Sequence, residues 1–174
     1  MIDINNESGV EADELSLVAL TRFALDRLRV HPQAEVSILL VDEETMSDYH
    51  VRFMDEPGPT DVMSFPMDEL RPPKDDEEPP LGLLGDIVLC PAVTARQAAD
   101  NGRTTDEEAE YLLVHGLLHL LGFDHAEPEE KTAMFGLNDQ IIAAWGQRKN
   151  VRAWEHPPVR APGSLDCSDQ QPST

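Results

Sequence analysis

Three histidines lie close together in the sequence, at positions 115, 119 and 125. His115 and His119 are four residues apart, so on a helix their side chains share one face, one turn apart. That spacing lets two imidazoles bind one zinc ion at about 2.0–2.1 Å. Gly122 can adopt the left-handed conformation that ends a helix, and the turn would return His125 to the same ion. The string predicts a site for one Zn²⁺ ion with these three histidines as ligands.

Such a site has hydrolytic chemistry. Three neutral imidazoles leave the ion its double positive charge and an open fourth position, where a water would ionise near neutral pH. Structural zinc sites usually have four protein ligands, often cysteines, and no fourth ligand is evident nearby. Asp124 is one candidate for it. We favour instead a catalytic role for Asp124, as a group that orients an imidazole or as a base beside the metal-bound water.

The string HGLLHLLGFDH has the form of the long zinc-protease motif, with one difference. Zinc proteases carry Glu directly after the first histidine, as the general base. Here that residue is Gly116. A peptidase without its base would lose a large part of its rate. The pattern therefore favours a hydrolytic metal centre over a peptidase, which stays open as an alternative.

Helices must position these side chains. Thr105 and Glu108 have the spacing of a capping box, which predicts a helix over residues 106–121 that ends at Gly122. Pro128 suits the first turn of a last helix that reaches about Trp145. Hydrophobic periodicity predicts the other elements. Strands are expected over residues 1–6, 36–41, 61–66 and 83–90, and helices over 11–30, 43–53 and 92–100.

This mixture of elements indicates a layered α+β or α/β domain. The 174 residues suit one domain, which we assign to residues 1–154. Residues 68–80 are acidic and rich in proline, so we expect a solvated loop there. Residues 155–174 are expected to form a disordered tail.

The formal net charge is −21, which argues against a non-specific hold on nucleic acid. Only two cysteines occur, so a reducing compartment is the simplest interpretation. The N-terminal residues lack a signal-peptide pattern. The longest apolar run, residues 111–123, is too short to span a bilayer. We expect a cytoplasmic protein that does not enter the membrane.

The histidine string resembles the signature of the YbeY endoribonuclease family, also called rRNA maturation factors. Two further segments resemble that family in the same order: PTDVMSFP at residues 59–66 and LGDIVL at residues 84–89. The resemblance covers roughly residues 1 to 150. It implies an α+β fold with a small mixed β-sheet and a zincin-like metal helix packed on it.

The resemblance also implies a function. Family members are bacterial, cytoplasmic, zinc-dependent endoribonucleases specific for single strands, and they act in 16S rRNA 3′-end maturation and ribosome quality control. Single-stranded rRNA, not DNA, would be the substrate, and His115, His119 and His125 would bind the zinc. The family has a functional arginine upstream of its Thr-Asp-Val segment, for which Arg52 is the nearest candidate. A guanidinium there would hold the phosphate oxygens; the alternative is a solvated helix residue.

Two other functions stay open. One is the zinc peptidase. The other is a non-catalytic ribosome-assembly factor with a structural metal, because an acidic surface suits basic partners such as ribosomal small-subunit proteins. That binding could coexist with catalysis, since a protein partner could deliver the acidic enzyme to its RNA.

Overall fold

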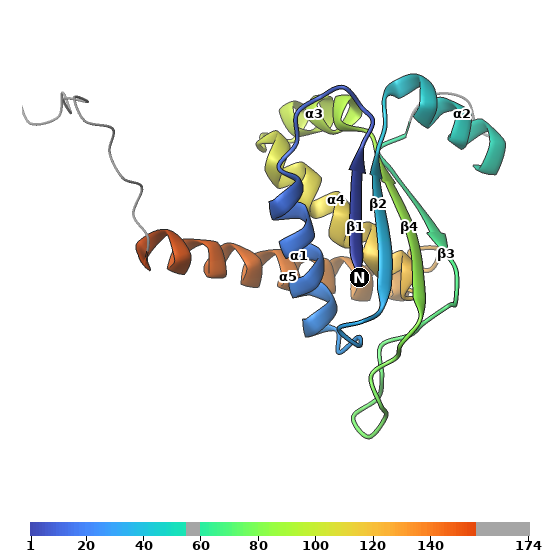
Figure 1. Cartoon of the computed structure of the whole chain (residues 1–174), viewed down its shortest axis with the longest axis vertical. Coiled ribbons are helices and arrows are strands. Elements are labelled where there is room, and N and C mark those ends of the chain that lie inside the picture. Colours follow the sequence, from blue (N-terminus) through green and yellow to red (C-terminus); the bar gives the residue numbers. More distant parts are fainter. Residues whose placement is uncertain (55–59, 156–174) are drawn as a thin grey trace, which may run out of the picture.

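The computed structural model describes residues 1–54 and 60–155, in which four strands form one sheet and five helices lie around it (Figure 1). In chain order the elements are β1 (Ile2–Asn6), α1 (Glu14–Arg27), β2 (Glu35–Leu40), α2 (Glu43–Met54), β3 (Val62–Pro66), β4 (Leu83–Leu89), α3 (Pro91–Asp100), α4 (Thr105–Leu120) and α5 (Pro128–Glu155).

The sheet is mixed, as the family resemblance implies. Its strand order is β1-β2-β4-β3, with β1, β2 and β4 parallel and β3 antiparallel to β4. Parallel neighbours need a crossover connection, which α1 supplies between β1 and β2. The antiparallel pair β3 and β4 is joined directly by residues 67–82, which contain the expected acidic segment and form neither helix nor strand. The α+β prediction is therefore confirmed.

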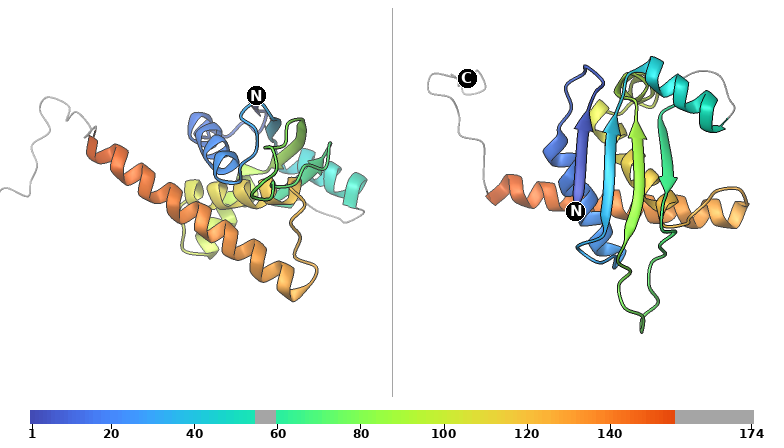
Figure 2. Two further views of the ribbon diagram at one scale, coloured as in Figure 1. Left: turned by 90° about the horizontal axis from the view of Figure 1, so that it is seen from below. Right: turned by 45° about the vertical axis from the view of Figure 1, so that its right-hand side comes forward.

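Helices α1 and α4 pack on one face of the sheet, and α5 packs against these two helices and extends beyond the sheet (Figure 2). Alternate strand residues point into this layer, as the two-residue period of a strand requires. Val36 and Ile38 of β2 and Ile87 of β4 are at most 2% exposed there. The opposite face is covered in part by α2, where Met46 packs in a second cluster with Met63 and Val88. No helix in the described part of the chain is long and apolar enough to cross a membrane.

The capping box at the start of α4 lies one residue earlier than expected. Thr104 is the N-cap: its hydroxyl accepts a hydrogen bond from the Glu107 backbone N–H at 3.1 Å, and the Glu107 carboxylate accepts one from the Thr104 backbone N–H at 3.1 Å. Thr105 is the first helical residue. Two adjacent threonines, each followed three residues later by Glu, made both registers possible in the sequence. In the structure the Glu108 carboxylate is buried and pairs with Arg103, so Glu107 and not Glu108 completes the capping box.

The last helix is longer than expected. We predicted an end near Trp145, where the apolar period fades, whereas α5 continues to Glu155. Gly146 costs a helix only about 1 kcal/mol, and the polar residues that follow include good helix formers. Lys149 also forms an ion pair with the buried Glu110 of α4, which holds this part of α5 against the domain. The predicted tail, apart from Glu155, lies outside the described residues.

Candidate metal centre

Helix α4 positions two of the three histidines. It lies directly on β3 and β4, and Gly116 faces the sheet: a Cβ at this residue would lie only 3.1 Å from Cγ2 of Ile87. His115 and His119 then lie on the side of the helix that borders a cleft. Position 116, where a zinc protease carries its general base, is buried against the sheet instead.

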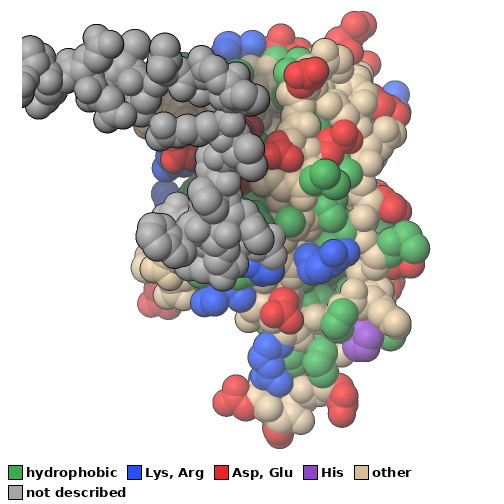
Figure 3. Space-filling model, turned by 60° about the vertical axis from the view of Figure 1, so that its left-hand side comes forward, with side chains coloured by type: hydrophobic (Ala, Val, Ile, Leu, Met, Phe, Trp, Pro, Cys, Tyr) green, Lys and Arg blue, Asp and Glu red, His purple; other side chains and the backbone are tan. Residues whose placement is uncertain are grey.

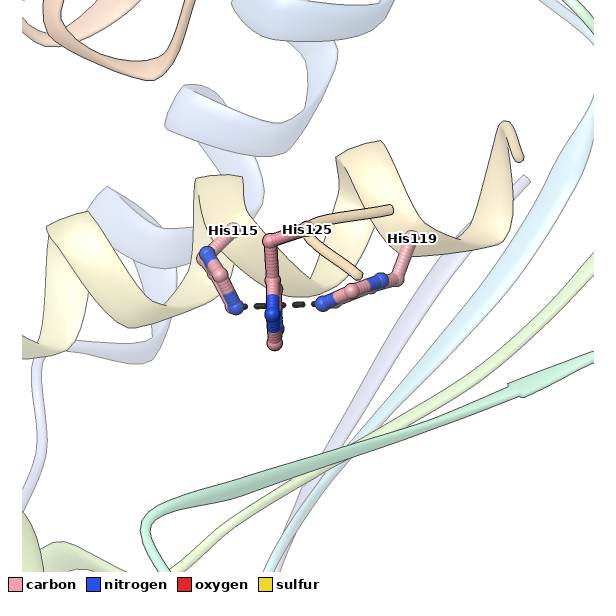
Figure 4. Close-up of side chains that lie close together, drawn as sticks. All are labelled: His115, His119 and His125. Carbon is pink, nitrogen blue, oxygen red and sulfur yellow. Dashed lines mark hydrogen bonds between the residues drawn. The ribbon is translucent and has the colours of Figure 1, made fainter. Parts of the chain in front are cut away.

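The turn after α4 brings the third histidine, His125, back to the other two. Gly122 has φ +89°, a left-handed conformation that favours glycine, and its N–H donates to the His119 carbonyl at 3.0 Å. The Phe123 N–H donates to the Leu118 carbonyl at 3.0 Å, which closes the helix end. The chain therefore reverses within three residues, and His125 comes back beside the helix (Figure 4).

The three imidazoles converge. One potential ligand atom from each of His115, His119 and His125 lies within 4.8 Å of the others. The Nε2 atoms of His115 and His119 are 3.1 Å apart (Figure 4). Two nitrogens bound tetrahedrally to one ion at 2.0–2.1 Å would be about 3.3–3.4 Å apart. The histidine set therefore fits a single small cation with imidazole-type preference, such as zinc.

Hydrogen bonding and burial prepare the rings for a metal. Nδ1 of His119 is 3.0 Å from the Phe123 carbonyl oxygen, so it carries the proton and leaves the Nε2 lone pair free. Burial, helped by the neighbouring His119 and His125, lowers the pKa of His115 to about 4. Burial and His125 lower the pKa of His119 as well, against the opposing effect of the Phe123 bond. Both rings are therefore neutral at pH 7, as metal ligands must be.

The histidines line a cleft of about 1030 Å³ between α4, β3 and the segments that follow them. Phe135 of α5 stacks on the His115 ring, with centroids 5.9 Å apart, and on the His125 ring at 6.3 Å. Besides these aromatic and imidazole rings, the cleft carries acidic side chains. They are Asp61, Glu69, Glu108 and Asp124.

The two other predicted site residues differ in position. Asp124 lines the cleft between Gly122 and His125, and its carboxylate accepts a 2.7 Å hydrogen bond from the His125 backbone N–H. Arg52 is exposed on α2 and is not among the described residues that line the cleft, although its neighbour Phe53 is. The structure thus brings Asp124 to the histidines and leaves Arg52 outside the cleft wall. The roles of both residues stay predictions.

Phe135 and Arg71 are cleft residues that the sequence analysis did not single out. Phe135 lies on a different helix, and its contact with the imidazoles depends on how α5 packs. Arg71 lies in the connection between β3 and β4, inside the segment predicted as a solvated loop. Neither residue has a local sequence signal, because each reaches the cleft only through tertiary structure.

Fold and site together define an α+β protein with a three-histidine metal-binding centre at the end of a helix. A family model described as "Endoribonuclease YbeY" matches residues 2–146 of the chain. Proteins named endoribonuclease YbeY are similar over most of their length. One, from Cutibacterium acnes, is 72% identical over 149 residues, which cover 86% of this chain and 96% of that protein. Another, from Streptomyces coelicolor, is 57% identical over 153 residues, covering 86% and 93%.

The chain therefore belongs to the endoribonuclease YbeY family, as the histidine string indicated. A solution structure of a Thermotoga maritima protein has the same fold, with a TM-score of 0.57 and 23% identity, covering 92% of this chain and all of that one.

Proposed function

We propose that this protein is a zinc-dependent endoribonuclease specific for single-stranded RNA, which acts in 16S rRNA 3′-end maturation and ribosome quality control in the cytoplasm. The observation that carries the proposal is the convergence of His115, His119 and His125 within 4.8 Å in a cleft. This site belongs to a chain 72% identical to a protein named endoribonuclease YbeY. Single-stranded rRNA is then the substrate, and ribosomal small-subunit proteins are expected partners.

In this proposal the three histidines hold the zinc ion, and the other cleft residues act around it. When bound, zinc supplies a Lewis acid and lowers the pKa of water toward neutrality. The Phe123 carbonyl fixes the His119 ring, so that its Nε2 stays directed at the ion. Phe135 packs flat on two imidazoles and limits their rotation. Asp124 belongs to the turn itself, directly before His125, and its role is to orient His125 or to accept a proton from the nucleophile.

Charge explains why such a protein would depend on its metal. Phosphodiester cleavage builds negative charge on the phosphate oxygens, which only cations or hydrogen-bond donors can stabilise. The surface offers little help: basic and acidic side chains are interspersed over the face in Figure 3, and the net charge is −21. Stabilisation therefore has to come from the ion and from individual cationic residues at the cleft. Arg52 is the residue predicted for this role from the sequence.

The same charge favours a second candidate, a ribosome-assembly factor whose metal is structural. An acidic protein attracts basic proteins over a long range, and ribosomal proteins of the small subunit are of this kind. Cells that carry metal-ligand variants would separate the two functions. Normal rRNA processing in those cells, with defective processing in a full deletion, would support the non-catalytic role.

The direct test compares RNA substrates. Zinc-loaded protein is incubated with a labelled single-stranded RNA and with the same RNA annealed to its complement. We expect internal cleavage of the single strand only, and loss of cleavage in His119→Ala. Equal cleavage by that variant would assign the activity to a contaminating nuclease and overturn the proposal.

A further inference from the structure

Arg71 is placed against the turn that carries the metal site. It belongs to the connection between β3 and β4, far from the histidines in sequence. Its guanidinium occupies the space that a Cβ at Gly122 would need. Gly122 lies midway between His119 and His125, and Arg71 lines the same cleft as both of them. A planar cation is therefore held over the backbone that links two of the three candidate ligands.

This guanidinium has no protein partner in the described part of the chain. Several other cations there are engaged: Arg96 pairs with Glu43, Arg103 with Glu108, and Lys149 with Glu110. Arg71 is exposed and takes part in none of the ion pairs that the described residues form. An arginine kept unpaired in a chain of net charge −21 has its five N–H donors free for a ligand.

Charge in the cleft points to the class of ligand. Arg71 is the one Lys or Arg among the described residues that line it, and four acidic side chains line it as well. Three of those four acids are already engaged. Glu108 pairs with Arg103, Asp124 accepts the His125 N–H, and Asp61 accepts the Val62 N–H at 2.7 Å. The unpaired guanidinium of Arg71 is thus free to bind an anionic group of a substrate, and it matches a phosphate in bidentate fashion.

We infer that Arg71 binds a backbone phosphate of the RNA substrate beside the metal centre. The inference rests on the proposed function. It gives the cleft a cationic residue, which the three-histidine motif does not contain. Arg71 lines the cleft, whereas Arg52 is not among the described residues that line it. A different role is also physically reasonable, since a cation near the end of α4 stabilises the helix dipole. The test must separate binding from such a structural role.

The experiment measures RNA binding apart from catalysis. Protein freed of metal with a chelator is titrated into a fluorescently labelled single-stranded RNA, and anisotropy gives Kd at several salt concentrations. Arg71→Ala is compared with Lys74→Ala, which removes a like charge from the same connection. We expect Arg71→Ala to weaken binding about tenfold or more, since a charge-assisted pair is lost. Its slope of log K against log salt should fall by about 0.7, the value for one lost phosphate contact on a single strand.

Further measurements decide the interpretation. Arg71→Lys should keep most of the salt slope but lose part of the affinity, because Lys acts as a point charge without a bidentate fork. The melting temperature of Arg71→Ala should match that of the wild type. A lower melting temperature with unchanged Kd would assign Arg71 to helix stabilisation and overturn the inference, as would equal Kd values for the Ala variants at both positions. If the wild type neither binds nor cleaves RNA, the proposed function itself fails.

Discussion

The hydroxyl of Ser64 donates a hydrogen bond to the backbone carbonyl of Gly116 at 3.1 Å, which ties β3 to the middle of the metal helix. Its Oγ also lies 3.2 Å from where a Cβ at Gly116 would be. Gly116, which directly follows His115, thus serves the contact between α4 and the sheet. The position that supplies a base in zinc proteases is a packing position here.

Gly116→Glu, which restores the protease pattern in sequence, should therefore destabilise the protein without creating a peptidase. The new side chain would start in a buried position against Ile87, Ser64 and Val62, and burying its carboxylate there should cost more than about 3 kcal/mol. Urea denaturation measures this loss. Gly136→Glu is the control, because a Cβ at Gly136 in α5 meets nothing within 4 Å. Casein cleavage by a stable Gly116→Glu protein would contradict the account.

The capping register predicts different effects for two adjacent threonines. Thr104→Ala removes the hydroxyl that accepts the Glu107 N–H and should cost about 1 kcal/mol of unfolding free energy. Thr105→Ala changes an exposed residue in the first turn and should be neutral within about 0.5 kcal/mol. Thermal unfolding of the two variants makes the comparison. The opposite order of stabilities would restore the register expected from the sequence.

The unfolding free energy of the metal-free protein should fall as the pH drops from about 6.5 toward about 4. In the folded protein burial holds the pKa of His115 at about 4, whereas in the unfolded chain it is near 6.5. Below pH 6.5 the unfolded state therefore binds a proton that the folded state does not, and folding is disfavoured. Above that pH both forms are neutral and the effect vanishes.

Urea titrations at pH 5 and 7 measure this dependence, and His115→Asn should reduce it. Part of the pH dependence should remain in that variant, because burial also lowers the pKa of His119. A His115→Asn protein with an unchanged difference between the two pH values would show that other groups cause the effect.

Asn138 of α5 is fully buried, and both polar atoms of its side-chain amide lack a hydrogen-bond partner among the described residues. Leaving such groups unsatisfied costs about 1–3 kcal/mol. Replacing Asn138 by Leu, which has a similar size, should raise the melting temperature of the metal-free protein. Gln140→Leu, an exposed substitution on the same helix, is the control. A lower melting temperature for Asn138→Leu would mean that the amide has a partner after all, such as a buried water.

The sequence predicted those parts of the molecule that depend on local pattern. The spacing of His115 and His119, with Gly122 after them, was sufficient to place all three imidazoles together. It was insufficient where tertiary contacts matter. The Glu108 carboxylate pairs with Arg103, so the capping box is formed by Thr104 and Glu107, and α5 continues along its contacts with α4. Arg71 reaches the cleft through an irregular connection, for which residue spacing has no rule.

The central claim is that one metal ion, held by the three histidines, is required for RNA cleavage. The most direct measurement is a zinc titration of chelator-treated protein, with bound zinc and cleavage of single-stranded RNA followed in the same samples. We predict that cleavage rises with occupancy and reaches its plateau at one ion per chain, and that His119→Ala shows neither tight binding nor cleavage. Cleavage by metal-free protein at the zinc-loaded rate, or full activity of His119→Ala, would contradict the account.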